Sequence, residues 1–198
     1  VNFDRLISNI RLLTKICKNK IEVNAIFVAT KANIGELVEY VGFCKGLNVD
    51  RILVNGLQIF LPGWSHLYLY SEQGNPEVQQ IFQRAYDKAK NNHINIEFPS
   101  LVAKPSVCGM HSTMTIDDKG NVAPCICLAR NTPFELFSKS KVLGPVVWGN
   151  VFDEDPLLIW RSKNSVQFRA KLKNKEVQEE CSLCVDAYGV GCSNRRSK

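Results

Sequence analysis

The stretch IEVNAIFVA, residues 21–29, is nearly all apolar and rich in β-branched side chains, as expected for a strand buried on both faces. Two further stretches have strand character: DRILVNGL at residues 50–57 and HINIEF at residues 93–98. Apolar residues recur at helical spacing before each of them, over residues 3–18, 34–44 and 78–89. The sequence therefore predicts three helix–strand repeats, which build a parallel sheet with helices as the crossovers.

Local signals mark where two of these helices begin. Asn33 and Glu36 have the spacing of a capping box, and Asn75 precedes a proline at the first helical position. Cys17 and Cys44 fall on the apolar stripes of the first two helices, so we interpret both as core residues. Three strands cannot close a barrel and would leave an exposed edge, so this half resembles the later part of something larger.

The second half of the chain, from about residue 100, is organised differently. Short strands are predicted at residues 112–116 and 121–126, joined by a DDKG turn in which Gly120 suits a positive φ. Residues 130–147 show no clear period and are predicted to be loop. Asp155 and Pro156 open another helix, and the tail from Cys181 is predicted to be loop.

Composition excludes several classes of protein. The chain has 198 residues, of which 45% are hydrophobic and 22% charged, as in ordinary globular proteins. No run of about 18 uncharged apolar residues exists, so the sequence predicts no membrane span. We expect no secretory leader, and the sequence contains no glycosylation sequon. Clustered cysteines are metal ligands more often than disulfides in a reducing compartment. These features favour a cytoplasmic protein.

The net charge of +6 is mostly scattered. Its densest run extends from Arg161 to Lys175, on a predicted helical stretch. We interpret this run as a solvated helix face, with a docking surface for an acidic peptide or partner as the alternative. No aromatic residues interleave with a basic patch, which argues against nucleic-acid binding.

Six of the eight cysteines lie in the second half, in a pattern typical of ligands. Cys108 is followed by eleven residues, Gly120, four residues and Cys125, so one thiol precedes the predicted hairpin and another ends it. Cys181 and Cys184 are separated by two residues, which lets both sulfurs approach one metal centre. Four thiolates suit Zn²⁺ and a [4Fe–4S] cluster equally well.

These cysteines, together with WGNV at residues 148–151 and IWRS at residues 159–162, resemble the C-terminal SPASM or shorter twitch extension of radical SAM enzymes. The preceding helices and strands resemble the later half of the radical SAM partial (β/α)6 barrel. The resemblance implies two domains, a half-barrel at residues 1–100 and a small cysteine-rich α+β domain with a β-hairpin at residues 101–198. It also implies an auxiliary [4Fe–4S] cluster bound by Cys108, Cys125, Cys181 and Cys184.

The sequence departs from the family pattern in two ways. The full SPASM pattern continues as C-x2-C-x5-C-x3-C, but Val190 and Asn194 stand where its last two cysteines would be. We therefore expect one auxiliary cluster, with Cys192 or Cys127 as a substitute or additional ligand. The second departure is that the C-x3-C-x2-C loop, which binds the S-adenosylmethionine cluster, does not occur in these residues. We expect a fragment of a larger enzyme that is inactive alone, with no catalytic residue of its own assigned.

In the complete enzyme, the resemblance implies S-adenosylmethionine, a second [4Fe–4S] cluster and the missing N-terminal half of the barrel. It also implies a peptide, protein or small-molecule substrate and a reductant such as flavodoxin or ferredoxin. Thr30, Asn55 and Ser100 follow the three predicted strands, where barrels place ligands, so they are candidate cofactor-binding residues with turn formation as the alternative. A different class of function stays open, a non-catalytic zinc-binding interaction module on an α/β scaffold. Aerobic preparation would leave the cysteines empty or paired.

Overall fold

The computed structural model describes residues 2–17, 20–58, 63–137 and 139–191, and it divides into two compact units. One unit comprises Val1–Leu57, Leu67–Val102 and Gly191–Lys198, and the other comprises Gln58–His66 and Ala103–Val190. We describe each unit by itself. No helix in the described ranges is both long and apolar enough to cross a lipid bilayer.

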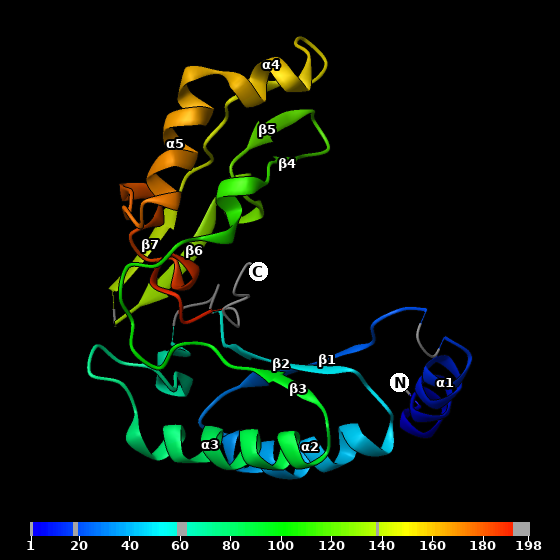
Figure 1. The fold of residues 1–198 in the computed structure, drawn as a ribbon. Helices are drawn as coiled ribbons and strands as arrows, with labels where there is room; N and C mark the ends of the chain where they lie inside the picture. The colour runs from blue at the N-terminus through cyan, green and yellow to red at the C-terminus, as the bar shows by residue number, and fades with distance from the viewer. Residues whose placement is uncertain (1, 18–19, 59–62, 138, 192–198) are drawn as a thin grey trace. The chain divides into compact units, whose positions relative to one another are not determined.

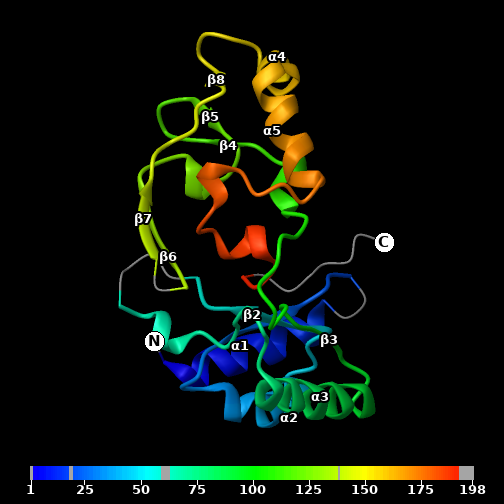
Figure 2. The same ribbon diagram turned by 90° about the vertical axis from the view of Figure 1, so that its left-hand side faces the viewer.

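The first unit is built on a three-stranded parallel sheet. Its elements in chain order are α1 (Phe3–Ile16), β1 (Asn24–Ala29), the 3-10 turn η1 (Ile34–Glu36), α2 (Leu37–Gly46), β2 (Arg51–Gly56), α3 (Pro76–Asn91) and β3 (Asn95–Glu97). The strand order is β1-β2-β3, with Asn24 opposite Arg51 and Arg51 opposite Asn95. Helices α2 and α3 lie side by side on one face of the sheet in both views (Figure 1, Figure 2).

The predicted helices and strands of this unit are confirmed, with ends that differ by a few residues. The prediction that the first strand is buried on both faces is wrong, because Ile26 and Val28 of β1 are 57% and 46% exposed. The strands are shorter than the apolar runs that predicted them; β1, for example, begins at Asn24 rather than at Ile21. The sheet is open among the described residues, so no closed barrel is present there. Its partial-barrel identity therefore stays a prediction.

The two predicted helix starts have different outcomes. Asn75 caps α3 as expected, because its side-chain oxygen accepts a hydrogen bond from the Val78 N–H at 3.2 Å. The capping box at Asn33 and Glu36 is wrong. The Asn33 side chain accepts hydrogen bonds from the N–H and hydroxyl of Thr30 instead, so it closes the turn after β1 and leaves the helix start uncapped.

The core of the first unit lies between the sheet and its helices. Leu37 and Val41 of α2 pack there with Ile52 and Val54 of β2, all fully buried. Cys44 is 1% exposed, which confirms it as a core residue. Cys17 is only half-buried and lies outside this core, so that prediction is wrong.

The reason for the exposure of Cys17 is the position of α1. The only buried residue of this helix is Thr14, whose hydroxyl donates to the Leu47 carbonyl oxygen at 3.0 Å. Ile7 and Ile10 pack partly against the core, while Phe3 and Ile16 are exposed. The apolar stripe of α1 is therefore wider than the surface that it covers.

The second unit contains two small antiparallel sheets and a helix pair. Its elements are η3 (Gly109–Ser112), β4 (Thr115–Ile116), β5 (Asn121–Ala123), η4 (Ile126–Leu128), β6 (Thr132–Leu136), β7 (Lys139–Leu143), β8 (Gly149–Asn150), α4 (Pro156–Arg161), α5 (Lys163–Lys173), η5 (Glu179–Cys181) and η6 (Val185–Tyr188). One sheet has the order β4-β5-β8, and β6 pairs with β7 in the other. The predicted hairpin and the helix start at Asp155 are confirmed.

The prediction of a loop over residues 130–147 is wrong, because β6 and β7 form an antiparallel hairpin there. Pro133 interrupts the pattern of β6, and the first four residues of β7 are exposed and mostly polar. Phe134, Leu136 and Leu143 are nevertheless buried and attach the hairpin to the unit. An apolar face spread over two short strands is too brief for a periodicity to reveal.

Candidate metal centre

Five cysteines come together in the second unit. Cys108 and Cys181 belong to a buried apolar cluster with Phe168 and Leu172 of α5. Cys125, Cys127 and Cys184 are partly buried and pack against the same cluster. The five thiols are brought from three separate segments of the chain into one apolar environment, which we call the cysteine cluster.

The hairpin β4–β5 connects the segments that carry Cys108 and Cys125. Its turn needs a glycine, because Gly120 has φ +79° and a Cβ there would lie 2.6 Å from the Phe152 ring and 2.7 Å from Asn150 Oδ1. Asp117 accepts hydrogen bonds from the Lys119 and Asn121 N–H groups across the turn. The Gly120 of the sequence pattern therefore has a structural role in the hairpin.

The WGNV segment supports the hairpin from the other side. Asn150 donates to the Lys119 carbonyl oxygen at 2.9 Å and to Asn121 Oδ1 at 3.1 Å, so it holds the turn to β8. A Cβ on Gly149 would lie 3.0 Å from Ile159 of α4, which allows only glycine to pack this closely without movement. Trp148 contacts the rings of Trp160 and Phe168 edge-on. This motif packs the helix pair against the hairpin.

The second pair of cysteines lies on two consecutive 3-10 turns. Cys181 ends η5, and its carbonyl oxygen accepts the Cys184 N–H at 3.0 Å. The chain then enters η6 and leaves it at Gly189, which has φ +71°. The Ser106 N–H donates to the Ala187 carbonyl oxygen at 2.9 Å. That bond connects the loop of the second pair to the segment just before Cys108.

Backbone N–H groups are directed at three of the sulfur atoms. The Met110 N–H donates to Cys108, the Leu128 N–H to Cys125, and the Ala187 N–H to Cys184. Hydrogen bonds to ligand sulfurs are one means by which proteins adjust an iron–sulfur cluster. The turns after these cysteines thus present donors to the sulfurs that would be thiolates in a cluster.

Burial keeps most of these thiols protonated in the metal-free chain. It raises the pKa of Cys108 to about 11 and that of Cys184 to about 12, and it also raises the pKa of Cys181. Negative charge on the neighbouring groups raises these pKa values further, with Asp186 contributing at Cys184. A metal centre would have to displace these protons when it binds.

Cys125 and Cys127 form a hydrogen-bonded pair. The Cys127 thiol donates to the Cys125 sulfur, which lowers the pKa of Cys125 to about 7, and the same bond raises the pKa of Cys127. The hydrogen bond places Cys127 beside the predicted ligand Cys125, and the role of Cys127 as a substitute or additional ligand stays a prediction.

Asp186 is a part of this region that sequence reasoning missed. Its Oδ2 accepts a hydrogen bond from Gln58 Nε2 at 2.6 Å, across 128 positions of the chain. Its Oδ1 is buried and has no hydrogen-bond partner among the described residues. The carboxylate also raises the pKa values of several thiols, so it lies near them. Nothing in the spacing of the sequence pointed to Gln58.

The donor set fits an iron–sulfur cluster. Thiolates are the ligands that such clusters use, and each of the four binds a different iron atom. A single zinc ion would instead need all of its ligands within bonding distance of one point, with Zn–S of about 2.3 Å. Within the described ranges, no group of three or more His, Cys, Asp or Glu side chains is arranged to hold one metal ion.

The remaining candidates of this half have simpler outcomes. Cys192 lies outside the described residues. The nearby His111 has its Nδ1 2.8 Å from the Cys108 carbonyl oxygen, so its ring is engaged with the backbone of η3. The assignment of Cys108, Cys125, Cys181 and Cys184 as ligands stays a prediction, now supported by their common environment.

The predicted cofactor-binding residues of the first unit lie at or beyond the carboxyl ends of its strands. The Thr30 hydroxyl and N–H both donate to Asn33, and the Ser100 hydroxyl donates to the Val102 carbonyl oxygen at 2.7 Å. Both residues therefore make turns, which was the alternative interpretation. Asn55 lies opposite Val28 near the end of β2. Their role in binding S-adenosylmethionine stays a prediction.

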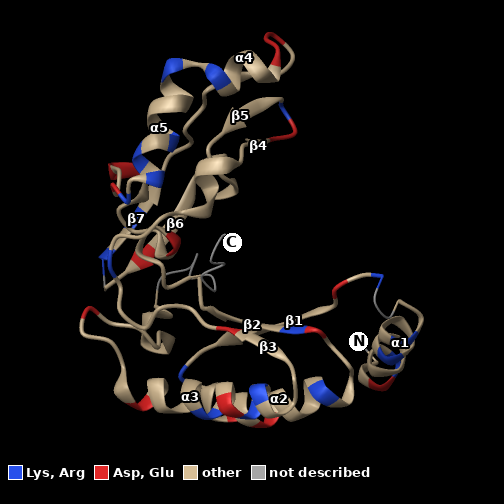
Figure 3. Ribbon diagram, viewed as in Figure 1, with Lys and Arg blue, Asp and Glu red and all other residues tan. Residues whose placement is uncertain are grey.

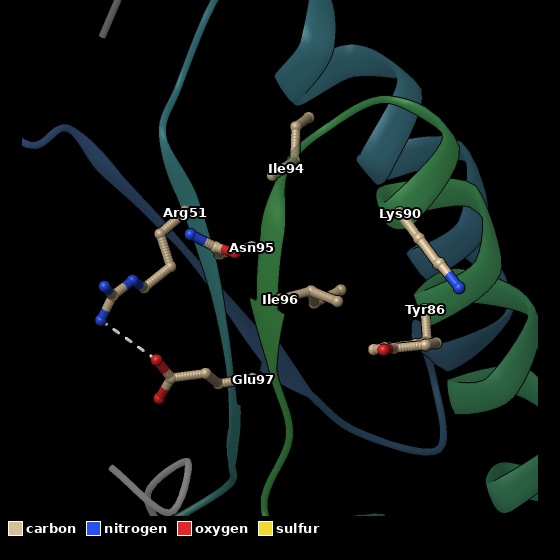
Figure 4. A pocket seen from close by; sticks show the side chains of 7 residues that line it. All are labelled: Arg51, Tyr86, Lys90, Ile94, Asn95, Ile96 and Glu97. Atoms are coloured by element: carbon tan, nitrogen blue, oxygen red, sulfur yellow. Dashed lines mark hydrogen bonds and ion pairs between the residues drawn. The ribbon is translucent and has the colours of Figure 1, made fainter. Parts of the chain in front are cut away.

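The first unit also has a pocket of about 350 Å³ along β3 (Figure 4). Arg51 begins β2 and Asn95 begins β3, while Tyr86 and Lys90 reach the pocket from α3. Arg51 pairs with Glu97 at 3.1 Å and with Glu22 at 2.8 Å. The lining of this pocket does not include Thr30, Asn55 or Ser100, so the pocket is separate from the predicted ligand-binding residues.

The cysteine-rich segment matches a known family model. Residues 108–185 match the family model of the SPASM iron–sulfur cluster-binding domain. A search of curated proteins found no match to the chain. The matched segment begins at Cys108 and extends one residue beyond Cys184, so it contains all four predicted ligands. Residues 108–185 are thus a SPASM iron–sulfur cluster-binding domain, consistent with the C-terminal SPASM domain of a radical SAM enzyme.

Proposed function

We propose that this chain is the C-terminal part of a radical SAM oxidoreductase or maturase, and that its second unit holds an auxiliary [4Fe–4S] cluster. The observation that carries the proposal is the gathering of Cys108, Cys125, Cys181 and Cys184 in one apolar cluster inside a SPASM match. The parallel sheet of the first unit supports the later half of a partial (β/α)6 barrel as its origin.

When bound, the auxiliary cluster would supply a one-electron redox centre or help to orient the substrate. The protein would hold it through the four thiolates, with N–H groups of the following turns donating to the sulfurs. The substrate would be a peptide, protein or small molecule, bound with S-adenosylmethionine near Thr30, Asn55 and Ser100. Since the chain contains no C-x3-C-x2-C loop, we expect it not to cleave S-adenosylmethionine by itself.

Anaerobic reconstitution with iron and sulfide tests the cluster. We expect a brown protein with about four irons per chain and a charge-transfer absorption that dithionite bleaches. Cys181→Ala and Cys184→Ala should each lower the iron content strongly, because each removes a thiolate. Cys17→Ala is the matched control: it removes a half-buried cysteine of the first unit and should leave the iron content unchanged.

The same preparation discriminates the zinc module. A colourless protein that retains one zinc and no iron after reconstitution would refute the cluster and favour that module. If the iron content per chain is unchanged in both Cys181→Ala and Cys184→Ala, the predicted ligand set is wrong and the cluster is bound by other residues. Identification of a C-x3-C-x2-C loop in a longer parent sequence would support the enzyme class.

A further inference from the structure

The positive charge of the chain is concentrated in one segment. Residues 156–175 contain six Lys or Arg and no Asp or Glu, whereas the rest of the chain holds 19 residues of each sign. The whole net charge of +6 therefore resides on α4, α5 and the residue pair that follows them. Figure 3 shows these Lys and Arg residues along the two helices.

Five of these six cations are available to a partner. Arg169 is occupied, because its guanidinium lies 3.5 Å from the centre of the Trp160 ring and donates to the Trp160 carbonyl oxygen at 2.9 Å. The other five are exposed, and none of them forms an ion pair within the described part of the chain. We call them the basic helix surface: Arg161, Lys163, Lys171, Lys173 and Lys175.

Apolar side chains lie among these cations. Leu157, Leu158 and Val166 are each between 46% and 64% exposed on the same two helices. A small apolar area surrounded by charges of one sign is typical of a transient docking surface, in which charge guides the encounter and apolar contact completes it.

The opposite side of α5 packs against the cysteine cluster. Phe168 and Leu172 are in contact with the group that contains Cys108 and Cys181, and α5 packs on η3, the turn that follows Cys108. An α-helix is about 10–12 Å across with its side chains. A protein docked on the basic helix surface would therefore be separated from the predicted cluster by about one helix.

We infer that the basic helix surface docks a small acidic one-electron carrier protein that exchanges electrons with the auxiliary cluster. The inference rests on the proposed function, since it needs a redox centre behind α5. In the exchange the reduced carrier loses one electron and the oxidised cluster gains it, and no bond forms or breaks.

Nucleic acid fits this surface less well. Binding to single strands uses exposed aromatic side chains on which bases stack. Here Trp160 is covered by Arg169 and Phe168 is buried against the cysteines. The surface offers charge and aliphatic side chains, which suit a folded acidic protein.

The test uses the reconstituted full chain and a reduced flavodoxin of net negative charge as the probe. Lys163→Glu combined with Lys171→Glu should weaken flavodoxin binding about tenfold or more at 50 mM NaCl and slow cluster reduction by a similar factor. The matched control is Arg5→Glu combined with Arg11→Glu, which reverses two exposed cations on α1 and gives the same net charge. The control should bind within twofold of the unmodified chain, and 500 mM NaCl should remove the difference between the two pairs.

Reduction by dithionite distinguishes the docking inference from the proposed function, because this small-molecule reductant reduces the cluster without binding to the basic helix surface. If dithionite reduces the cluster equally in all variants while both charge-reversal pairs bind flavodoxin alike, the docking inference is wrong and the proposed function stands. Equal or tighter binding of a single-stranded oligonucleotide to the same surface, lost in the same variant, would also overturn the inference. A chain that takes up no iron refutes the proposed function and, with it, the docking role.

Discussion

Gly120→Ala should destabilise the second unit more than a glycine substitution at any less crowded turn. Gly120 combines two constraints, since its φ of +79° disfavours a side chain and its surroundings leave no room for one. The added Cβ would meet Asn150 Oδ1 at 2.7 Å, and this oxygen accepts the Phe152 N–H at 2.9 Å. The substitution therefore strains the turn and displaces the side chain that joins it to β8.

The cost can be estimated from these two effects. An alanine held at this φ costs about 1–2 kcal/mol relative to glycine. Displacing Asn150 weakens its hydrogen bonds to Lys119, Asn121 and Phe152, and losing one or two of them costs roughly 1 kcal/mol each. Phe152 adds little because its side chain is 78% exposed and can turn away. The expected loss in the free energy of unfolding is about 2–4 kcal/mol.

Urea denaturation of the metal-free chain, followed by tryptophan fluorescence in reductant, measures this loss. The three tryptophans, Trp64, Trp148 and Trp160, all lie in the second unit, so their emission reports that unit. Two controls separate the effects: Gly63→Ala, at φ +94° with no atom within 4 Å, should show the backbone strain alone, and Gly144→Ala should be nearly neutral. If Gly120→Ala costs no more than Gly63→Ala, the crowding at Asn150 does not stabilise the hairpin.

Two predictions concern the metal centre. Asp186→Asn should raise the reduction potential of the reconstituted cluster by roughly tens of millivolts, because it removes a negative charge from a carboxylate whose Oδ1 lies buried near the thiols. Spectroelectrochemistry measures this shift. An unchanged potential would show that the charge of Asp186 does not act on the cluster. Iron retention should fall as the pH falls from about 8.5 to 6.5, because burial raises the pKa values of Cys108 and Cys184 and protons compete for these sulfurs. Iron content after gel filtration at each pH tests this, and retention that is equal across the range would contradict it.

Much of the first unit could be predicted because its elements are long and their apolar spacing is regular. The β-branched run at residues 21–29 correctly predicts a strand, although not the exposure of Ile26 and Val28, and Asn75–Pro76 correctly predicts the start of α3. The error at Asn33 arose because an asparagine before a helix can bond forward or backward, and here it bonds back to Thr30. The width of the apolar stripe of α1 says nothing about how much of it the rest of the fold covers.

The sequence predicted which cysteines would come together in the metal centre, but it did not predict the residues around them. Two cysteine pairs around a hairpin are visible in the sequence, because ligand spacing is local. The Gln58–Asp186 hydrogen bond is not visible, since it joins residues 128 positions apart and neither belongs to a metal-ligand pattern. The position of Cys127 beside Cys125 depends similarly on the single turn η4, which no periodicity predicts.

The spacing of four residues between Gly120 and Cys125 has a physical explanation in this hairpin. Gly120 closes the turn, and the next three residues form β5, whose Val122 pairs with Ile116 on one side and Gly149 on the other. The buried Pro124 then ends the strand, so that Cys125 starts the turn toward the cysteine cluster. Inserting one residue between Gly120 and Cys125 would reverse the faces of β5 or displace the thiol, since side chains alternate along a strand. The turn at Gly120 thus fixes the register of β5, and that register sets the position of the Cys125 sulfur.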